Sequence, residues 1–258
     1  MDVIYSITCH ESPDSFIDTL KNIFYYNRLN IAIVVHANHY MFIALQNHCM
    51  KNVYLHDKPY NKRIETHDIC KAHIENFRYC RDNNIIAKYI IPLASNCYFH
   101  SFVTLDTIES LLSKREKIEN PPVVFHTDWH WPVFYQNRYI NSCLAKEGYL
   151  SLYGYQHEGI ILEYSSINKI VDLVDKYSIW DHVEREAIFE EYFIQTIYTY
   201  ESKHSLATLC KVFWNNVNYT PSIDQIKTCE LPCVKRVHRS YNDHVRVWQR
   251  TITNNYST

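Results

Sequence analysis

The chain has 258 residues, of which 47% are hydrophobic and 21% are charged, a composition typical of a globular protein with one large domain or two small ones. Its only glycines are Gly148, Gly154 and Gly159, which excludes the glycine-rich phosphate loops of dinucleotide dehydrogenases and P-loop NTPases. A formal net charge of -2 gives no reason to expect a nucleic-acid partner.

Signals for export and membrane insertion are missing from the sequence. It contains no run of about 18 apolar residues, and its N-terminus lacks the basic and apolar regions of a signal peptide. The nine cysteines include no C-x-x-C pair. We therefore expect a cytoplasmic protein with reduced and mostly buried thiols. The alternative for the thiols is a redox pair formed by Cys229 and Cys233.

Strands and helices are predicted to alternate through residues 1–115. Short apolar or alternating runs predict strands over 3–9, 31–35, 53–55 and 89–93. Apolar residues at helical spacing follow Ser12-Pro13, Thr66 and Thr104, where a small polar side chain can cap the first turn. This alternation is typical of an α/β fold with a parallel sheet.

Polar side chains follow three of the predicted strands. His10 and Glu11 come after the first strand, His36 after the second, and Ser95 and Asn96 after the strand over 89–93. Ligands of parallel sheets bind in the crevice at the carboxyl ends of the strands. We therefore expect these residues to line a binding crevice.

The second half of the chain is less regular. A strand is predicted over 123–125 and helices over 166–177 and 184–200, whereas the segment 126–155 is rich in aromatic residues and has no clear period. No internal repeat or linker divides the sequence. A single domain over 1–258 is therefore expected.

Two stretches and their order along the chain resemble a known enzyme family. They are Tyr89-Ile-Ile-Pro-Leu-Ala-Ser-Asn-Cys-Tyr-Phe99 and Phe189-Glu-Glu-Tyr-Phe-Ile-Gln-Thr-Ile197, which follow the opening strand and its histidine loop. The pattern resembles the core-2/I-branching N-acetylglucosaminyltransferases and protein xylosyltransferases of glycosyltransferase family 14. This resemblance implies a GT-A-like fold, with a nucleotide-binding half over 1–115 and an acceptor-binding and catalytic half over 116–258.

The resemblance also implies a mechanism. Family members are inverting enzymes that need no metal cofactor, and they transfer a sugar from a nucleotide sugar, here a UDP-sugar, to a glycan hydroxyl. The match places the catalytic base on Glu191. A carboxylate at the start of a helix stays ionised and can take a proton from an attacking hydroxyl. The resemblance implies that basic residues near the C-terminus, here Lys235, Arg236 and Arg239, stabilise the leaving diphosphate, and such charges suit phosphate. The resemblance assigns His10, Glu11, His36, Ser95 and Asn96 to the nucleotide.

The sequence departs from the family at several points. His36 stands where the family has an aspartate that helps to hold the nucleoside base, and no acidic residue occurs over 89–99. The Golgi anchor and paired cysteines of the animal enzymes are absent, which implies a soluble relative of bacterial or viral type. Its acceptor would be a polysaccharide, a lipopolysaccharide or a glycoprotein, with peripheral membrane association left open.

The aromatic segment offers alternatives to this assignment. His126, Asp128 and His130 alternate as strand neighbours would, and two histidines with an aspartate can bind a metal ion. They would make the protein a metal-dependent hydrolase. Trp129 and Trp131 would otherwise stack on an acceptor sugar, and Glu158 is assigned to the same acceptor site. A module that binds glycans or nucleotides without turnover is the non-enzymatic alternative.

Overall fold

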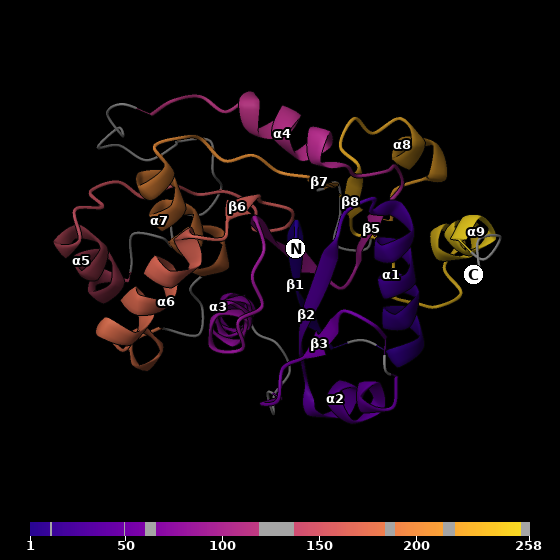
Figure 1. Cartoon of the computed structure of the whole chain (residues 1–258), viewed down its shortest axis with the longest axis horizontal. Helices are drawn as coiled ribbons and strands as arrows, with labels where there is room; N and C mark the ends of the chain where they lie inside the picture. Colours follow the sequence, from indigo (N-terminus) through magenta and orange to yellow (C-terminus); the bar gives the residue numbers. More distant parts are fainter. Residues whose placement is uncertain are drawn as a thin grey trace.

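The computed structural model describes residues 1–10, 12–48, 50–59, 66–118, 137–183, 189–213 and 220–253. Its main sheet has five strands in the order β3-β2-β1-β4-β6 (Figure 1). These strands are β1 (Val3–Cys9), β2 (Ile31–Ala37), β3 (Val53–Leu55), β4 (Tyr89–Ala94) and β6 (Leu162–Glu163). The first four are parallel and β6 is antiparallel to β4. The predicted α/β class, with a mostly parallel sheet between helices, is confirmed.

Both faces of this sheet are covered. Every residue of β1 and β2 is buried, as expected for parallel strands with helices on either side. One face packs on helices α3 (Thr66–Asp82), α5 (Arg138–Lys146), α6 (Ser166–Lys176) and α7 (Phe193–Ser202). The other packs on α1 (Pro13–Tyr26), α2 (His39–Gln46) and α4 (Leu105–Ser113). None of the helices in the described ranges is long and apolar enough to cross a membrane.

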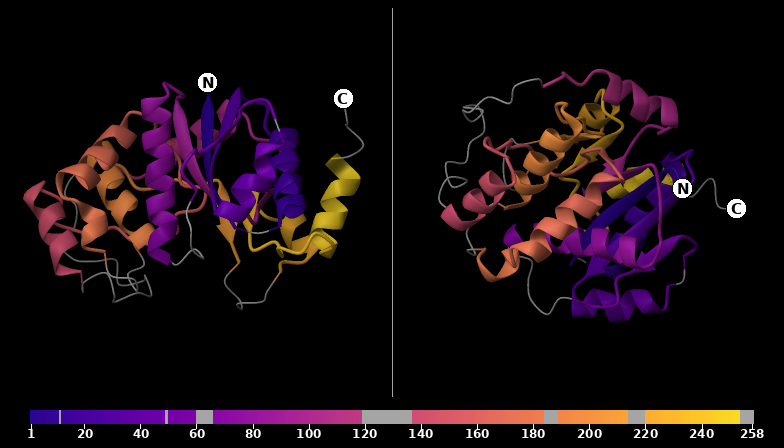
Figure 2. Two further views of the ribbon diagram at one scale, coloured as in Figure 1. Left: turned by 90° about the horizontal axis from the view of Figure 1, so that it is seen from below. Right: turned by 60° about the vertical axis from the view of Figure 1, so that its left-hand side comes forward.

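A second, smaller sheet lies on the α1 side and was not predicted. Its strands are β5 (Cys97–Phe99), β8 (Cys233–Lys235) and β7 (Cys210–Val212), in the order β5-β8-β7. Short strands of this kind give almost no periodic signal. One face packs on the main core. The other contacts residues of α8 (Ile223–Lys227) and α9 (His244–Thr253), and α9 runs beside α1, as the left view of Figure 2 shows.

Two predicted helix starts are confirmed in detail. Ser12 caps α1 by accepting a hydrogen bond from the Ser15 backbone, and Thr104 forms a capping box with Thr107 at the start of α4. The helix predicted over 184–200 is wrong in its beginning. Residues 189–191 form a separate 3-10 turn, η3 (Phe189–Glu191), before α7.

The break falls at Tyr192. Its backbone lies outside the helical region, at φ -140° and ψ -29°, and its side chain is buried. Across this bend the ring of Phe189 stacks on that of Phe193 at 4.4 Å between centroids, and both rings are buried. The predicted strand over 123–125 lies outside the described residues. The division into a nucleotide-binding and an acceptor half stays a prediction.

Candidate functional site

The chain after β8 returns to the start of α1. The Ser15 hydroxyl donates a hydrogen bond of 2.9 Å to the backbone oxygen of Arg239. The buried Arg246 guanidinium donates to the backbone oxygens of Ser15, at 2.8 Å, and His238, at 2.7 Å. These bonds fix the segment 236–240 beside the N-terminal turn of α1, which follows the carboxyl end of β1. A basic segment is thereby placed at the sheet edge where ligands of parallel sheets bind.

The basic residues of this segment differ in their surroundings. Lys235 is the last residue of β8 and donates a short hydrogen bond to Glu158. Arg236 adopts a left-handed backbone with φ 82°, which turns the chain sharply after the strand. Arg239 is exposed. Arg239 therefore lies at the surface, whereas the Lys235 side chain is turned toward the buried Glu158.

Glu158 lies in the interior as well, with 2% of its surface exposed. Burial alone would raise the pKa of its carboxyl, but His157 and Lys235 lower the pKa to about 2. The Nε2 atom of His157 is 3.1 Å from a carboxylate oxygen of Glu158, in an orientation that is not a hydrogen bond. Glu158 is therefore an ionised carboxylate held by Lys235. Glu158, which was predicted to bind an acceptor, is therefore buried in this structure.

Two histidines extend this buried group toward the main sheet. The ring of His73, on α3, lies 5.5 Å from that of His157, and its Nδ1 is 2.8 Å from the hydroxyl oxygen of Ser6 on β1. Burial lowers the pKa of His157 to about 4 and that of His73 well below 6.5. Both rings are therefore neutral at pH 7. We call His73, His157, Glu158 and Lys235 the buried polar cluster.

The turn η3 is hydrogen-bonded to the loop that carries His157 and Glu158 of the buried polar cluster. The side-chain amide of Gln195 donates to the backbone oxygens of Tyr155 and Glu190, at 2.8 and 2.7 Å. The Tyr155 amide donates to the Glu191 backbone oxygen at 2.8 Å. Glu191 is partly exposed, as a base that must reach an acceptor should be. The structure thus brings the predicted base and the buried polar cluster onto connected segments.

Sequence reasoning missed the neighbouring carboxylate of Glu190. Only 5% of this residue is exposed, and its Oε2 atom has no hydrogen-bond partner among the described residues. Burial, reinforced by the charges of Glu191 and Glu158, raises the pKa of Glu190 well above 4.5. The sequence pattern does not show which of these two adjacent glutamates is buried and which is accessible to solvent. Only the bend at Tyr192 decides which faces the interior.

His36 is held differently from the prediction. Its ring nitrogens lie 3.3 and 2.9 Å from the backbone oxygens of Ala72 and Lys58, and its ring stacks on His56 at 4.5 Å. Burial lowers its pKa. Both ring nitrogens of His36 therefore face backbone oxygens, one on α3 and one in the segment around Lys58. Its predicted contact with a nucleotide stays a prediction.

The other predicted residues are placed as follows. Ser95 and Asn96 follow β4 and are buried, and the Ser95 backbone oxygen accepts from the Thr19 hydroxyl of α1 at 3.0 Å. The Asn96 Oδ1 atom has no hydrogen-bond partner within the described ranges. His10 follows β1 directly. The predicted residues Glu11, His126, Asp128, Trp129, His130 and Trp131 lie outside the described residues.

No protein-family model matches the chain, and no curated protein matches it. The crystal structure of the galactosyltransferase LgtC in complex with donor and acceptor sugar analogs aligns with 100% of this chain and 97% of that chain, at 10% identity and a TM-score of 0.44. An active-site mutant of LgtC aligns over the same shares, at 11% identity and a TM-score of 0.45. Likeness this distant leaves the function to be inferred from the chain's own side chains.

Proposed function

We propose that the protein is a glycosyltransferase of GT-A-like fold, which transfers a sugar from a nucleotide sugar to a glycan hydroxyl. One observation carries the proposal. The basic segment 236–240 is hydrogen-bonded over the start of α1, at the carboxyl edge of the parallel sheet. Guanidinium groups offer forked donors that suit phosphate oxygens, and the backbone amides at a helix start favour the same charge. This combination fits a nucleoside diphosphate.

The proposed donor site has two parts. His10, at the end of β1, would contact the nucleoside, for which we propose uridine, and the buried Ser95 and Asn96 at the end of β4 would support that edge from behind. Arg236 and Arg239 would hold the diphosphate, whereas the charge of Lys235 is already paired with Glu158. The sequence after β4 offers no carboxylate for a divalent cation, so we propose that these arginines balance the leaving-group charge without one.

In the proposed reaction Glu191 is the base. It takes the proton of the acceptor hydroxyl, the hydroxyl oxygen forms a bond to C1 of the donor sugar, and the bond between C1 and the phosphate oxygen breaks. The nucleoside diphosphate leaves with both electrons of that bond, and Arg236 and Arg239 stabilise its charge. In-line attack inverts the configuration at C1. Glu190 is too deeply buried to reach an acceptor and takes no part in this step.

Binding of the diphosphate is tested by titrating UDP and uridine into wild type and Arg239→Ala. A charge-assisted hydrogen bond contributes about 1.5–3 kcal/mol, so UDP affinity should fall by about 10- to 150-fold. Uridine affinity should stay unchanged, because uridine carries no phosphate. Arg138→Ala, an exposed arginine at the start of α5, is the matched control and should bind both ligands as wild type does. Equal UDP affinity in Arg239→Ala would remove this residue from the site.

Catalysis is tested with the two adjacent glutamates. Glu191→Gln keeps the shape of the side chain but cannot accept a proton, so turnover should fall by about 10²- to 10⁴-fold with donor affinity unchanged. Glu190→Gln should leave turnover within a few-fold of wild type. If Glu191→Gln keeps half of the activity, the base lies elsewhere. The anomeric configuration of the product, read by NMR, tests inversion.

A further inference from the structure

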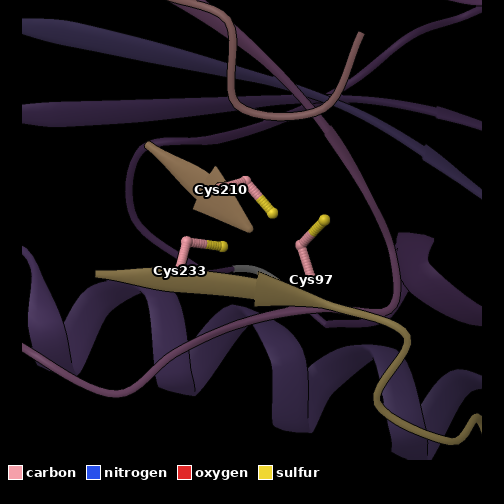
Figure 3. Close-up of side chains that lie close together, drawn as sticks. All are labelled: Cys97, Cys210 and Cys233. Carbon is pink, nitrogen blue, oxygen red and sulfur yellow. The ribbon is translucent and has the colours of Figure 1, made fainter. Parts of the chain in front are cut away.

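Three cysteines of the smaller sheet converge in the interior. Cys97, Cys210 and Cys233 are each fully buried, and their sulfur atoms all lie within 4.8 Å of one another. Figure 3 shows the three side chains gathered close together. All three thiols are free, as expected for reduced and mostly buried cysteines, and no disulfide joins Cys233 to Cys229, which was the alternative. We call these residues the cysteine triad.

The strand register explains the convergence. Cys210 on β7 is directly opposite Cys233 on β8, and Cys97 on β5 is directly opposite Lys235, two residues further along β8. Opposed residues, and residues two apart on a strand, point to the same face of a sheet. All three thiols and the Lys235 side chain therefore share the face that packs on the main core. The triad is built by the pairing of three strands and needs no movement to form.

A loop closes over this face. The Gly159 amide donates to the Pro92 backbone oxygen, and the Leu209 amide donates to the Gly159 oxygen, both at 2.8 Å. Gly159 has φ 77°, and a Cβ atom there would lie 2.5 Å from the Cys210 Cβ. Glycine is required here both for its backbone angle and for this close approach. The loop thus covers Cys210 with backbone and leaves the three sulfurs facing one another.

We infer that the cysteine triad is a binding site for one thiophilic metal ion of the Zn²⁺ class, held by three thiolates. Zn²⁺ binds thiolate sulfur at about 2.3 Å, which sets the sulfur separations in a tetrahedral site at about 3.8 Å. The sulfur atoms of the triad lie within 4.8 Å of one another, so each would have to move by no more than about 1 Å to bind the ion. Rotation about the Cα–Cβ bonds can supply this without moving the strands.

Charge favours the same ligand. Three thiolates carry three negative charges, which a buried site holds only against strong positive charge. A divalent cation reduces this to one negative charge, and the Lys235 ammonium on the same face is already paired with Glu158. Thiolate ligands select zinc-like ions over Mg²⁺ and Mn²⁺, which prefer oxygen. The site is therefore separate from the diphosphate site and does not rest on the proposed function.

The test uses the full chain, purified with a non-thiol reductant and loaded with Co²⁺ without oxygen. Tetrahedral thiolate coordination gives Co²⁺ visible d–d bands and a thiolate-to-cobalt charge-transfer band in the near ultraviolet. We expect both bands to saturate at about one ion per chain and to disappear when Zn²⁺ is added, because Zn²⁺ competes for the same ligands. Elemental analysis of the Zn²⁺-loaded chain should give the same stoichiometry.

Variants assign the ligands. Cys97→Ser and Cys210→Ser should each abolish or shift the charge-transfer band, whereas Cys70→Ser, a fully buried thiol of α3 outside the triad, should keep the wild-type spectrum. Where a variant fails to fold, the wild-type protein still tests the proposal. Its metal-loaded form should melt at a higher temperature than the form from which a chelator has removed the metal. Absence of tetrahedral thiolate bands from the loaded wild type, or a disulfide within the triad in the reduced chain, would overturn the proposal.

Discussion

Removing the Lys235 ammonium should destabilise the protein through the carboxylate that it leaves behind. Glu158 is 2% exposed, and Lys235 is its hydrogen-bonded cation. Breaking a buried ion pair from one side costs about 3–5 kcal/mol, because the remaining charge is uncompensated. His157 and this lysine together lower the pKa of Glu158 to about 2, against the effect of burial, so the folded protein holds Glu158 as the charged form. Lys235→Met should therefore lower the free energy of unfolding by about 3 kcal/mol.

The two partners of this pair should respond unequally. The Lys235 side chain is 22% exposed, so in Glu158→Gln the ammonium can still be hydrated, and the loss should be nearer 1 kcal/mol. The double variant leaves no buried charge and should be more stable than Lys235→Met alone. Urea unfolding at pH 7 of all four proteins gives the coupling energy of the pair, which should reach about 2 kcal/mol. If each single variant loses less than about 1 kcal/mol of unfolding free energy and the two losses add in the double variant, the reasoning is refuted.

A second carboxylate provides the control. The pKa of Glu147 is also lowered to about 2, by Lys176, Tyr177 and Lys169, but its lysine partners are 58% and 41% exposed. Exposed ion pairs contribute between zero and about 1 kcal/mol, so Glu147→Gln should change stability little. Since the folded pKa of Glu158 lies below the unfolded value, the contribution of Glu158 is present above pH 4.5. It should be lost as the pH falls from 4.5 toward about 2.

Three further predictions concern other buried groups. Glu190→Gln should stabilise the chain increasingly between pH 5 and pH 8 in urea titrations, because burial raises the pKa of Glu190 and the wild type loses stability as the pH rises above 4.5. Acidification from pH 6.5 to pH 5 should destabilise the wild type, because only the unfolded chain protonates His73 and His157 there. The slope for each histidine should approach about 1.4 kcal/mol per pH unit as protonation of the unfolded chain becomes complete, and a flat profile would contradict this. Arg246→Lys should lower the free energy of unfolding by about 2–4 kcal/mol in chemical denaturation, because the buried guanidinium donates hydrogen bonds to two backbone oxygens and a tyrosine hydroxyl. A loss below about 1 kcal/mol would show that lysine replaces those hydrogen bonds.

Local signals in the sequence were sufficient for the longer strands of the main sheet. The apolar runs that became β1, β2 and β4 are long enough to be recognised as strands, and Ser12 and Thr104 mark helix starts by their own hydrogen bonds. Parallel order follows because helices alternate with those strands. The carboxyl edge of the sheet, with His10, Ser95 and Asn96 on it, could therefore be predicted without the structure.

Pairing between distant segments decided the rest. Glu158 and Lys235 are 77 residues apart, and the cysteine triad joins three strands of only three residues each, too short for any periodic pattern. Glu190 and Glu191 are the same residue type, and only the bend that buries Phe189 turns one inward. Periodicity and capping are properties of neighbouring residues, so the sequence alone could determine them. Strand register and the burial of charge depend on what packs opposite, and that is set only when the chain folds.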